Sequence, residues 1–198
     1  MASSINTENF FKQACIFEGS LIGLALVLGW LADINPFASL YFSETAFLHG
    51  IIATLPIFMI FLALYQLNIK SLTKIKTLLL DMLGPVLLRY HWTDLLILAA
   101  IAGISEEILF RGVIQPWMES SWGMLTGLIV SSILFGLAHA VTLLYFLLAT
   151  LMSAYLGLLL DIEASRNLLI PIVTHGFYDF LAFLVIAHSY RHQHKNDY

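Results

Sequence analysis

The stretch LLILAAIAGISEEILFRGVI, residues 95–114, decides the fold of this 198-residue chain. It has the length that a helix needs to cross a bilayer, and most of its residues are apolar. Yet it contains Glu106, Glu107 and Arg111. A charged side chain at the bilayer centre costs about 3 kcal/mol on insertion scales, so it is retained where function or a firm partner requires it. The stretch therefore predicts a membrane-spanning helix that carries a polar site.

The composition of the whole chain also indicates a membrane protein. Hydrophobic residues make up 60% of it and charged residues only 11%, whereas a soluble domain is about half apolar and a quarter charged. Lipid solvates this excess of apolar side chains as well as a protein core does. The formal net charge of -4, without a basic cluster, predicts no nucleic-acid partner. Cys15 is the one cysteine, so no internal disulfide can form.

Further apolar runs predict the rest of the bundle. They comprise residues 16–31, 46–67, 122–138, 143–160 and 168–187. The segment 78–88 is too short to span and is interrupted by Gly84-Pro85, so we expect an interfacial or re-entrant helix. The predicted fold is all-α: one transmembrane domain over residues 1–198, a polytopic helix bundle with about six spanning helices plus this short one. No small-x-small cleavage site follows the first run, which predicts a retained anchor rather than a signal peptide.

The distribution of Lys and Arg predicts the orientation of these spans. With both ends of the chain in the cytoplasm, nearly all basic residues outside the spans fall on the inner side. They are Lys12, Lys70, Lys74, Lys76, Arg89, Arg191 and Lys195. Only Arg166 falls outside, and the loop 33–45 on that side has no basic residue. We therefore expect a multi-pass protein of the cytoplasmic (inner) membrane with both termini in the cytoplasm.

The polar residues of the 95–114 stretch divide into a pair and a single carboxylate. Glu107 and Arg111 are four residues apart, so they share a helix face and can pair. Glu106 then lies about 100° around the helix, without a local counter-ion. A carboxylate in an apolar setting without a counter-ion is suited to accept a proton from water. Glu106 is therefore the candidate general base.

Two later spans also carry polar residues at helical spacing. Phe135 and His139 are four residues apart, and so are His175 and Asp179. A carboxylate at that spacing can hold an imidazole in one tautomer. Three helices are thus expected to direct a polar group toward a common interior.

Other polar residues are not expected to belong to this site. Glu18 and Asp94 sit at expected helix ends, which predicts an interfacial position for both. The other histidines lie at span ends or in the tail and are given no role. They are His49, His91, His188, His192 and His194.

This set of motifs resembles a known protease family. The match consists of Glu106-Glu107-x-x-x-Arg111, Phe135-x-x-x-His139 and His175-x-x-x-Asp179. In order, spacing and span context these resemble the CAAX protease and bacteriocin-processing (CPBP, or abortive-infection) family of intramembrane glutamate proteases. The resemblance covers about half of the chain, and it implies a catalytic core over residues 94–187.

The resemblance implies a role for each matching residue. Glu106 corresponds to the glutamate that activates the attacking water, and His139 to the histidine that assists it. His175 corresponds to a histidine that stabilises the oxyanion. Glu107 and Arg111 correspond to motif members whose role is partly structural, and Phe135 belongs to the supporting set.

Asp179 departs from part of the family. It stands where the prenyl-protein endopeptidases have Asn, although many bacterial relatives resemble this chain in having an acidic residue there. An ionised Asp cannot donate a hydrogen bond to an oxyanion. Either Asp179 is protonated, or it orients His175 and the histidine donates instead.

The predicted function is an intramembrane endopeptidase that hydrolyses peptide bonds with a glutamate-activated water and without a metal or cofactor. The zincin motif His-Glu-x-x-His and the Gly-x-Ser-x-Gly elbow are absent. Two alternatives stay open: a zinc-dependent membrane protease on the same residues, and a non-catalytic immunity or transport-type membrane protein. The expected partners are the lipid bilayer and a peptide or membrane-protein substrate. The sequence specifies neither the substrate nor the oligomeric state.

Overall fold

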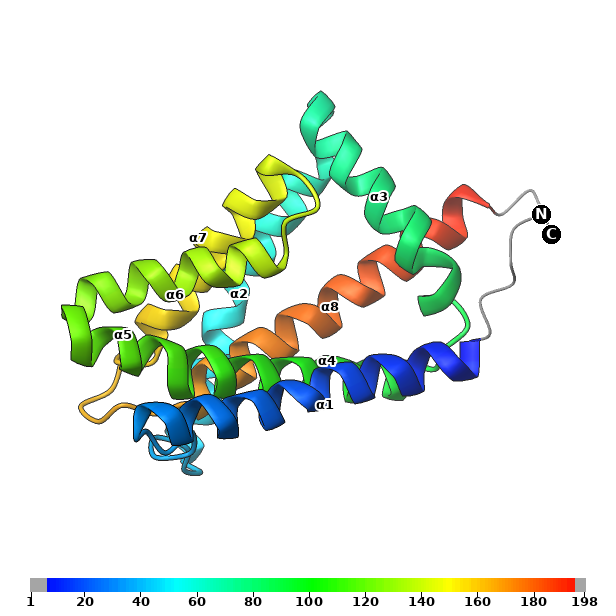
Figure 1. Cartoon of the computed structure of the whole chain (residues 1–198). Helices are drawn as coiled ribbons and strands as arrows, with labels where there is room; N and C mark the ends of the chain where they lie inside the picture. The colour runs from blue at the N-terminus through cyan, green and yellow to red at the C-terminus, as the bar shows by residue number, and fades with distance from the viewer. Residues whose placement is uncertain (1–6, 195–198) are drawn as a thin grey trace.

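The computed structural model describes residues 7–194, which form an all-helical bundle (Figure 1). The elements are α1 (Thr7–Ala32), α2 (Glu44–Gln66), α3 (Lys70–Leu87), α4 (Trp92–Leu109), the π-helix η1 (Phe110–Ile114), α5 (Gln115–Trp122), α6 (Met124–Ala138), α7 (Leu143–Leu159) and α8 (Leu169–Gln193). Because α4, η1 and α5 follow one another without a break, they form one long helix. The two chain ends, including the Lys195 of the topology prediction, lie outside the described residues.

The bundle has the properties of a membrane protein, which confirms the predicted fold class. Within residues 7–194, three helices are long and apolar enough to cross a membrane: Phe10–Ala32, Glu44–Gln66 and Leu169–Gln193. Two more predicted spans are the shorter apolar helices α6 and α7, and the 95–114 stretch lies within the continuous α4–η1–α5 helix. Large apolar side chains such as Trp30 and Leu143 are exposed on the outside, where lipid can cover them.

Helix α8 holds the bundle together. It packs against α4, α2 and α3, while α1 lies beside α4, and α6 lies beside α5 and α7 (Figure 1). Hydroxyl groups tie α2 to α8: Thr174 Oγ1 donates to the Gly50 carbonyl at 3.0 Å, and Thr54 Oγ1 to the Thr174 carbonyl at 3.3 Å. The helices that carry the predicted polar residues therefore surround one interior.

The short helix is longer than the sequence predicts. It begins at Lys70 and continues through Gly84 and Pro85 to Leu87, so the expected interruption at Gly84-Pro85 is wrong. Pro85 lies two residues before the helix end, where it removes only one helical hydrogen bond. The Tyr190 ring of α8 packs directly on Gly84, since any Cβ there would overlap it. Packing between α3 and α8 thus outweighs the local helix-breaking tendency.

The first helix also extends further than predicted. It begins at Thr7 rather than near residue 16, so Glu18 lies in its middle and the expected position at a helix end is wrong. Asp94 does lie at a helix end, where its carboxylate accepts from the His91 N–H at 3.1 Å and completes a capping box on α4.

An ion-pair network fixes the loop between α7 and α8. Arg166 donates to Glu119 of α5 at 2.6 Å and to Asp161 at 2.7 Å. The hydrogen bond to Asp161, together with the one to Glu119, raises the pKa of Arg166 above its usual value. The network therefore holds the loop that precedes α8 against α5.

Two glycines bring α4 and α8 into direct backbone contact. A Cβ at Gly103 would lie 2.7 Å from the Gly176 nitrogen, and a Cβ at Gly176 would lie 3.2 Å from the Ala99 carbonyl oxygen. Small residues at such crossings allow helices in membranes to approach closely. This approach places Glu107 of α4 beside His175 of α8.

The close crossing predicts the effect of a single methyl group. Replacing Gly103 by Ala forces the two backbones apart, and we expect a loss of about 1–3 kcal/mol of stability from overpacking. Gly19→Ala on α1 is the matched control, because no atom lies within 4 Å of a Cβ there. Thermal unfolding in detergent should show a lower midpoint for Gly103→Ala only. Equal midpoints for the two variants would contradict the crossing.

Candidate active site

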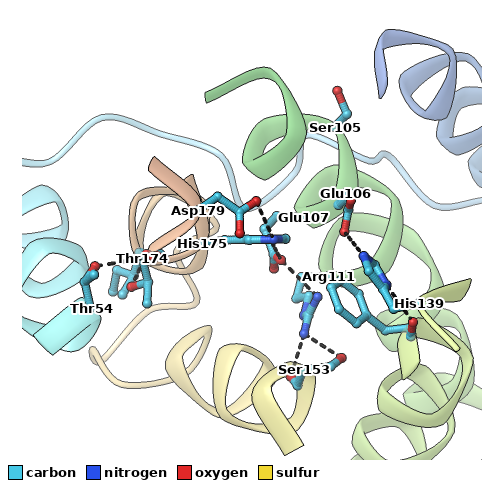
Figure 2. Close-up of polar contacts among 12 residues, drawn as sticks. Thr54, Ser105, Glu106, Glu107, Arg111, His139, Ser153, Thr174, His175 and Asp179 are labelled. Carbon is cyan, nitrogen blue, oxygen red and sulfur yellow. Dashed lines mark hydrogen bonds and ion pairs between the residues drawn. The ribbon is translucent and has the colours of Figure 1, made fainter. Parts of the chain in front are cut away.

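Glu107 is the most enclosed acidic residue of the interior. Its side chain is fully buried on α4, and Oε1 accepts two hydrogen bonds (Figure 2). Arg111 Nη1 donates one at 3.0 Å, and His175 Nδ1 donates the other at 2.8 Å. One carboxylate oxygen thus joins the long α4–η1 helix to α8, and fixes the imidazole of His175 through its Nδ1 atom.

Arg111 extends the same network to α6 and α7. It is 2% exposed, and its Nη2 donates to the carbonyl and the hydroxyl of Ser153 on α7, the latter at 2.8 Å. Its guanidinium lies 5.2 Å from the centre of the Phe135 ring of α6, within range of a cation–π interaction. Arg111 belongs to the π-helix η1, and such local widenings occur frequently at functional sites.

Glu106 has a different environment from its neighbour. It is 8% exposed, and its Oε2 lies 3.7 Å from His139 Nε2. Within residues 7–194 that oxygen has no hydrogen-bond partner. The spacing is too long for a direct hydrogen bond and is suited to a bridging water.

His139 is held so that one ring nitrogen faces Glu106. It is the residue that ends α6, and its Nδ1 donates to the Phe135 carbonyl at 2.9 Å. Its ring stacks on the Phe135 ring with centroids 4.4 Å apart. Nδ1 carries the proton that is donated to Phe135, and the other ring nitrogen, Nε2, faces the Glu106 carboxylate (Figure 2).

His175 faces a carboxylate at each ring nitrogen. Nδ1 contacts Glu107, and Nε2 lies 3.5 Å from Asp179 Oδ2 one turn further along α8. The side chain of His175 is 4% exposed, whereas that of Asp179 is 23% exposed. The Nε2 end is therefore the more accessible side of the ring.

The structure brings all seven predicted site residues together. The Phe135 ring lies between two of them, 4.4 Å from the His139 ring and 5.8 Å from the His175 ring. Sequence reasoning missed Ser153, whose only signal is a hydroxyl in an otherwise apolar run. It also misplaced Glu18, which belongs to the inward face of α1.

Two cavities lie beside the site rather than in it. The larger, of about 610 Å³, is bounded by the α3–α4 corner and α8, and the smaller, of about 140 Å³, lies between α3 and Tyr145 of α7. Neither is lined by Glu106, His139 or His175. Among the site residues, His139 and Asp179 have partly exposed side chains.

The geometry also bears on metal binding. Among the described residues, no group of three or more His, Cys, Asp and Glu side chains is placed to hold a metal ion. The acidic and imidazole groups instead contact one another and Arg111.

The comparison with protein families agrees with the resemblance carried by the motifs. The fold and the site together show that this protein is a membrane protein with a buried polar site of carboxylates and imidazoles. Residues 88–181 match the family model of the Type II CAAX prenyl endopeptidase Rce1-like proteins, a protease family. The matched segment spans α4 to α8 and includes all seven site residues. No curated protein matches the chain, and no solved structure does.

The network predicts how the Glu107–Arg111 pair contributes to stability. Arg111→Met leaves a buried carboxylate without its cation, and we expect a loss of about 3–5 kcal/mol. Adding Glu107→Gln removes the orphaned charge, so the double variant should recover part of that loss. Unfolding free energies in detergent measure the coupling, with the exposed Arg89→Met as control. Additive effects of the two substitutions would show that the pair is not coupled.

Proposed function

We propose that this protein is an intramembrane endopeptidase that hydrolyses peptide bonds with a water activated by Glu106, without a metal ion. The observation that carries the proposal is the unpartnered Glu106 Oε2, buried 3.7 Å from His139 Nε2. A water held between these two atoms is placed to lose a proton as it attacks. The match of residues 88–181 to a protease family supports this reaction class.

The proposed reaction transfers one proton twice. Glu106 takes a proton from the water as the water oxygen bonds to the carbonyl carbon, which gives a tetrahedral oxyanion. The carbon–nitrogen bond then breaks, and Glu106, assisted by His139, passes the proton to the leaving amine. The products are a new carboxyl terminus and a free amine, so atoms and protons balance.

His175 and Asp179 are proposed to stabilise the oxyanion. A doubly protonated His175 ring has a donor at each nitrogen, one of which is bound to Glu107. The Nε2 donor, on the more exposed side, is then directed at the substrate. Since Glu107 already holds the ring, Asp179 is not required to orient it. In its protonated form Asp179 supplies a second donor, as an Asn would.

The proposed substrate class rests on the match to a protease family, and the proposed location rests on the distribution of charged residues. We propose a peptide or membrane-protein substrate, cleaved by a core of residues 94–187 within the single domain 1–198. We further propose the inner membrane as its location, with both termini in the cytoplasm, from the distribution of basic residues.

The proposal predicts that Glu106 is indispensable for cleavage and dispensable for folding. Glu106→Ala and the isosteric Glu106→Gln should each reduce kcat by a factor of about 10³ or more, because no other group replaces the base. Cleavage of a peptide library by purified protein in detergent measures the effect. Glu44→Gln is the matched control, since Glu44 is exposed at the start of α2.

Three outcomes separate this proposal from the alternatives. Full activity of the Glu106 variants contradicts it. Loss of wild-type activity on chelation, with stoichiometric zinc in the active protein, indicates the zinc-dependent mechanism instead. Cellular function that survives in a cleavage-deficient variant indicates a role in binding rather than in catalysis.

A further inference from the structure

Glu18 is a charged residue on the packing face of α1. The partly or fully buried positions of that helix recur every three to four residues, which marks one inward face. They include Ala14, Cys15, Glu18, Leu21, Ile22 and Ala25. Ala25, two turns further along, belongs to the hydrophobic core formed with η1 and α6. Glu18 is therefore directed at α4 and the interior, not at the surrounding lipid.

The carboxylate of Glu18 is shielded without being paired. Its Oε2 is inaccessible and has no hydrogen-bond partner in the described part of the chain. It interacts electrostatically with Glu106, Asp179, His175 and His139, which are the four proposed catalytic residues. An intramembrane carboxylate of this kind is costly to insert, and its position on the face of α1 that packs against α4 indicates a functional role.

The charges around the site leave an excess of carboxylates. Arg111 is bound to Glu107, so its charge is already balanced. With Asp179 protonated and His175 doubly protonated, as proposed above, ionised Glu18 and Glu106 face one charged imidazole, since the proton of His139 lies on Nδ1. One carboxylate is then left without a counter-ion. In a poorly solvated site such an excess attracts cations strongly.

We propose that Glu18 is a specificity-determining residue that binds a basic group of the substrate, a Lys or Arg side chain near the scissile bond. Glu18 Oε2 and Glu106 Oε2 are buried and have no hydrogen-bond partner among the described residues, and they belong to helices α1 and α4, which pack against each other. The base of the reaction needs Glu106 free for water. Glu18 supplies a second acceptor on the α1 side, where a cation can be bound without competing for that base. This inference rests on the proposed peptidase activity.

A substrate series tests the role of Glu18. The peptides are identical except for Lys, Gln or Glu at the residues flanking the cleaved bond, and the full chain is assayed in detergent. Wild type should prefer Lys over Glu by about tenfold or more in kcat/KM, the value of a charge-assisted hydrogen bond. Glu18→Gln should abolish this preference, and Glu18→Lys should reverse it. Glu44→Lys, a charge reversal at an exposed site, should leave the preference unchanged.

The outcomes separate the role of Glu18 from the proposed peptidase activity. If cleavage depends on Glu106 but Glu18→Gln lowers kcat/KM equally for all peptides, Glu18 is structural or moves protons, and the inference is overturned. If Glu18→Lys does not fold, Glu18→Gln alone decides between these results. If wild type cleaves no peptide, equilibrium binding of the same series still measures the preference. A wild type that neither cleaves nor discriminates in binding overturns both proposals.

Discussion

The buried carboxylate of Glu107 is the constraint on which the rest of the interior depends. An ion removed from water requires both a counter-ion and hydrogen bonds, and Glu107 obtains them from Arg111 and His175. The hydrogen bond from His175 to Glu107 requires α4 and α8 to cross closely. The small glycines Gly103 and Gly176 permit this backbone contact. The hydrogen bond also fixes the ring of His175. The adjacent Glu106 is left without such partners, so two neighbouring glutamates have different environments, and the one without partners is the base that we propose.

The same network connects α6 and α7 to the long α4–η1 helix. Arg111 reaches Ser153 of α7 and the Phe135 ring of α6, and Phe135 in turn stacks on His139. We expect a loss of these contacts to alter the distance between His139 and Glu106. Catalytic groups must be held within a fraction of an ångström of a productive geometry. The π-helix η1, which directly follows Glu106 and Glu107 on the same continuous helix, belongs to this support.

Local patterns in the sequence were sufficient for the features that depend on one helix. The four-residue spacing predicted the Glu107–Arg111 pair, and apolar runs predicted the all-helical membrane fold.

The start of α1 was misjudged because polar residues such as Lys12 and Gln13 are tolerated at a span end. This concealed that Glu18 lies in the middle of the helix. The continuation of α3 through Gly84-Pro85 depends on Tyr190, and the contribution of Ser153 depends on Arg111. These are contacts between distant segments, which periodicity alone cannot specify.

The water that we propose between Glu106 and His139 provides the most direct test of the mechanism. An experimental structure of the protein at a resolution that shows ordered water, with anomalous data collected at the zinc edge, would examine it. The account predicts one water within hydrogen-bond distance of Glu106 Oε2 and His139 Nε2, and no anomalous peak there. A zinc ion on these residues, or a Glu106 carboxylate turned away from His139 into a separate ion pair, would contradict it.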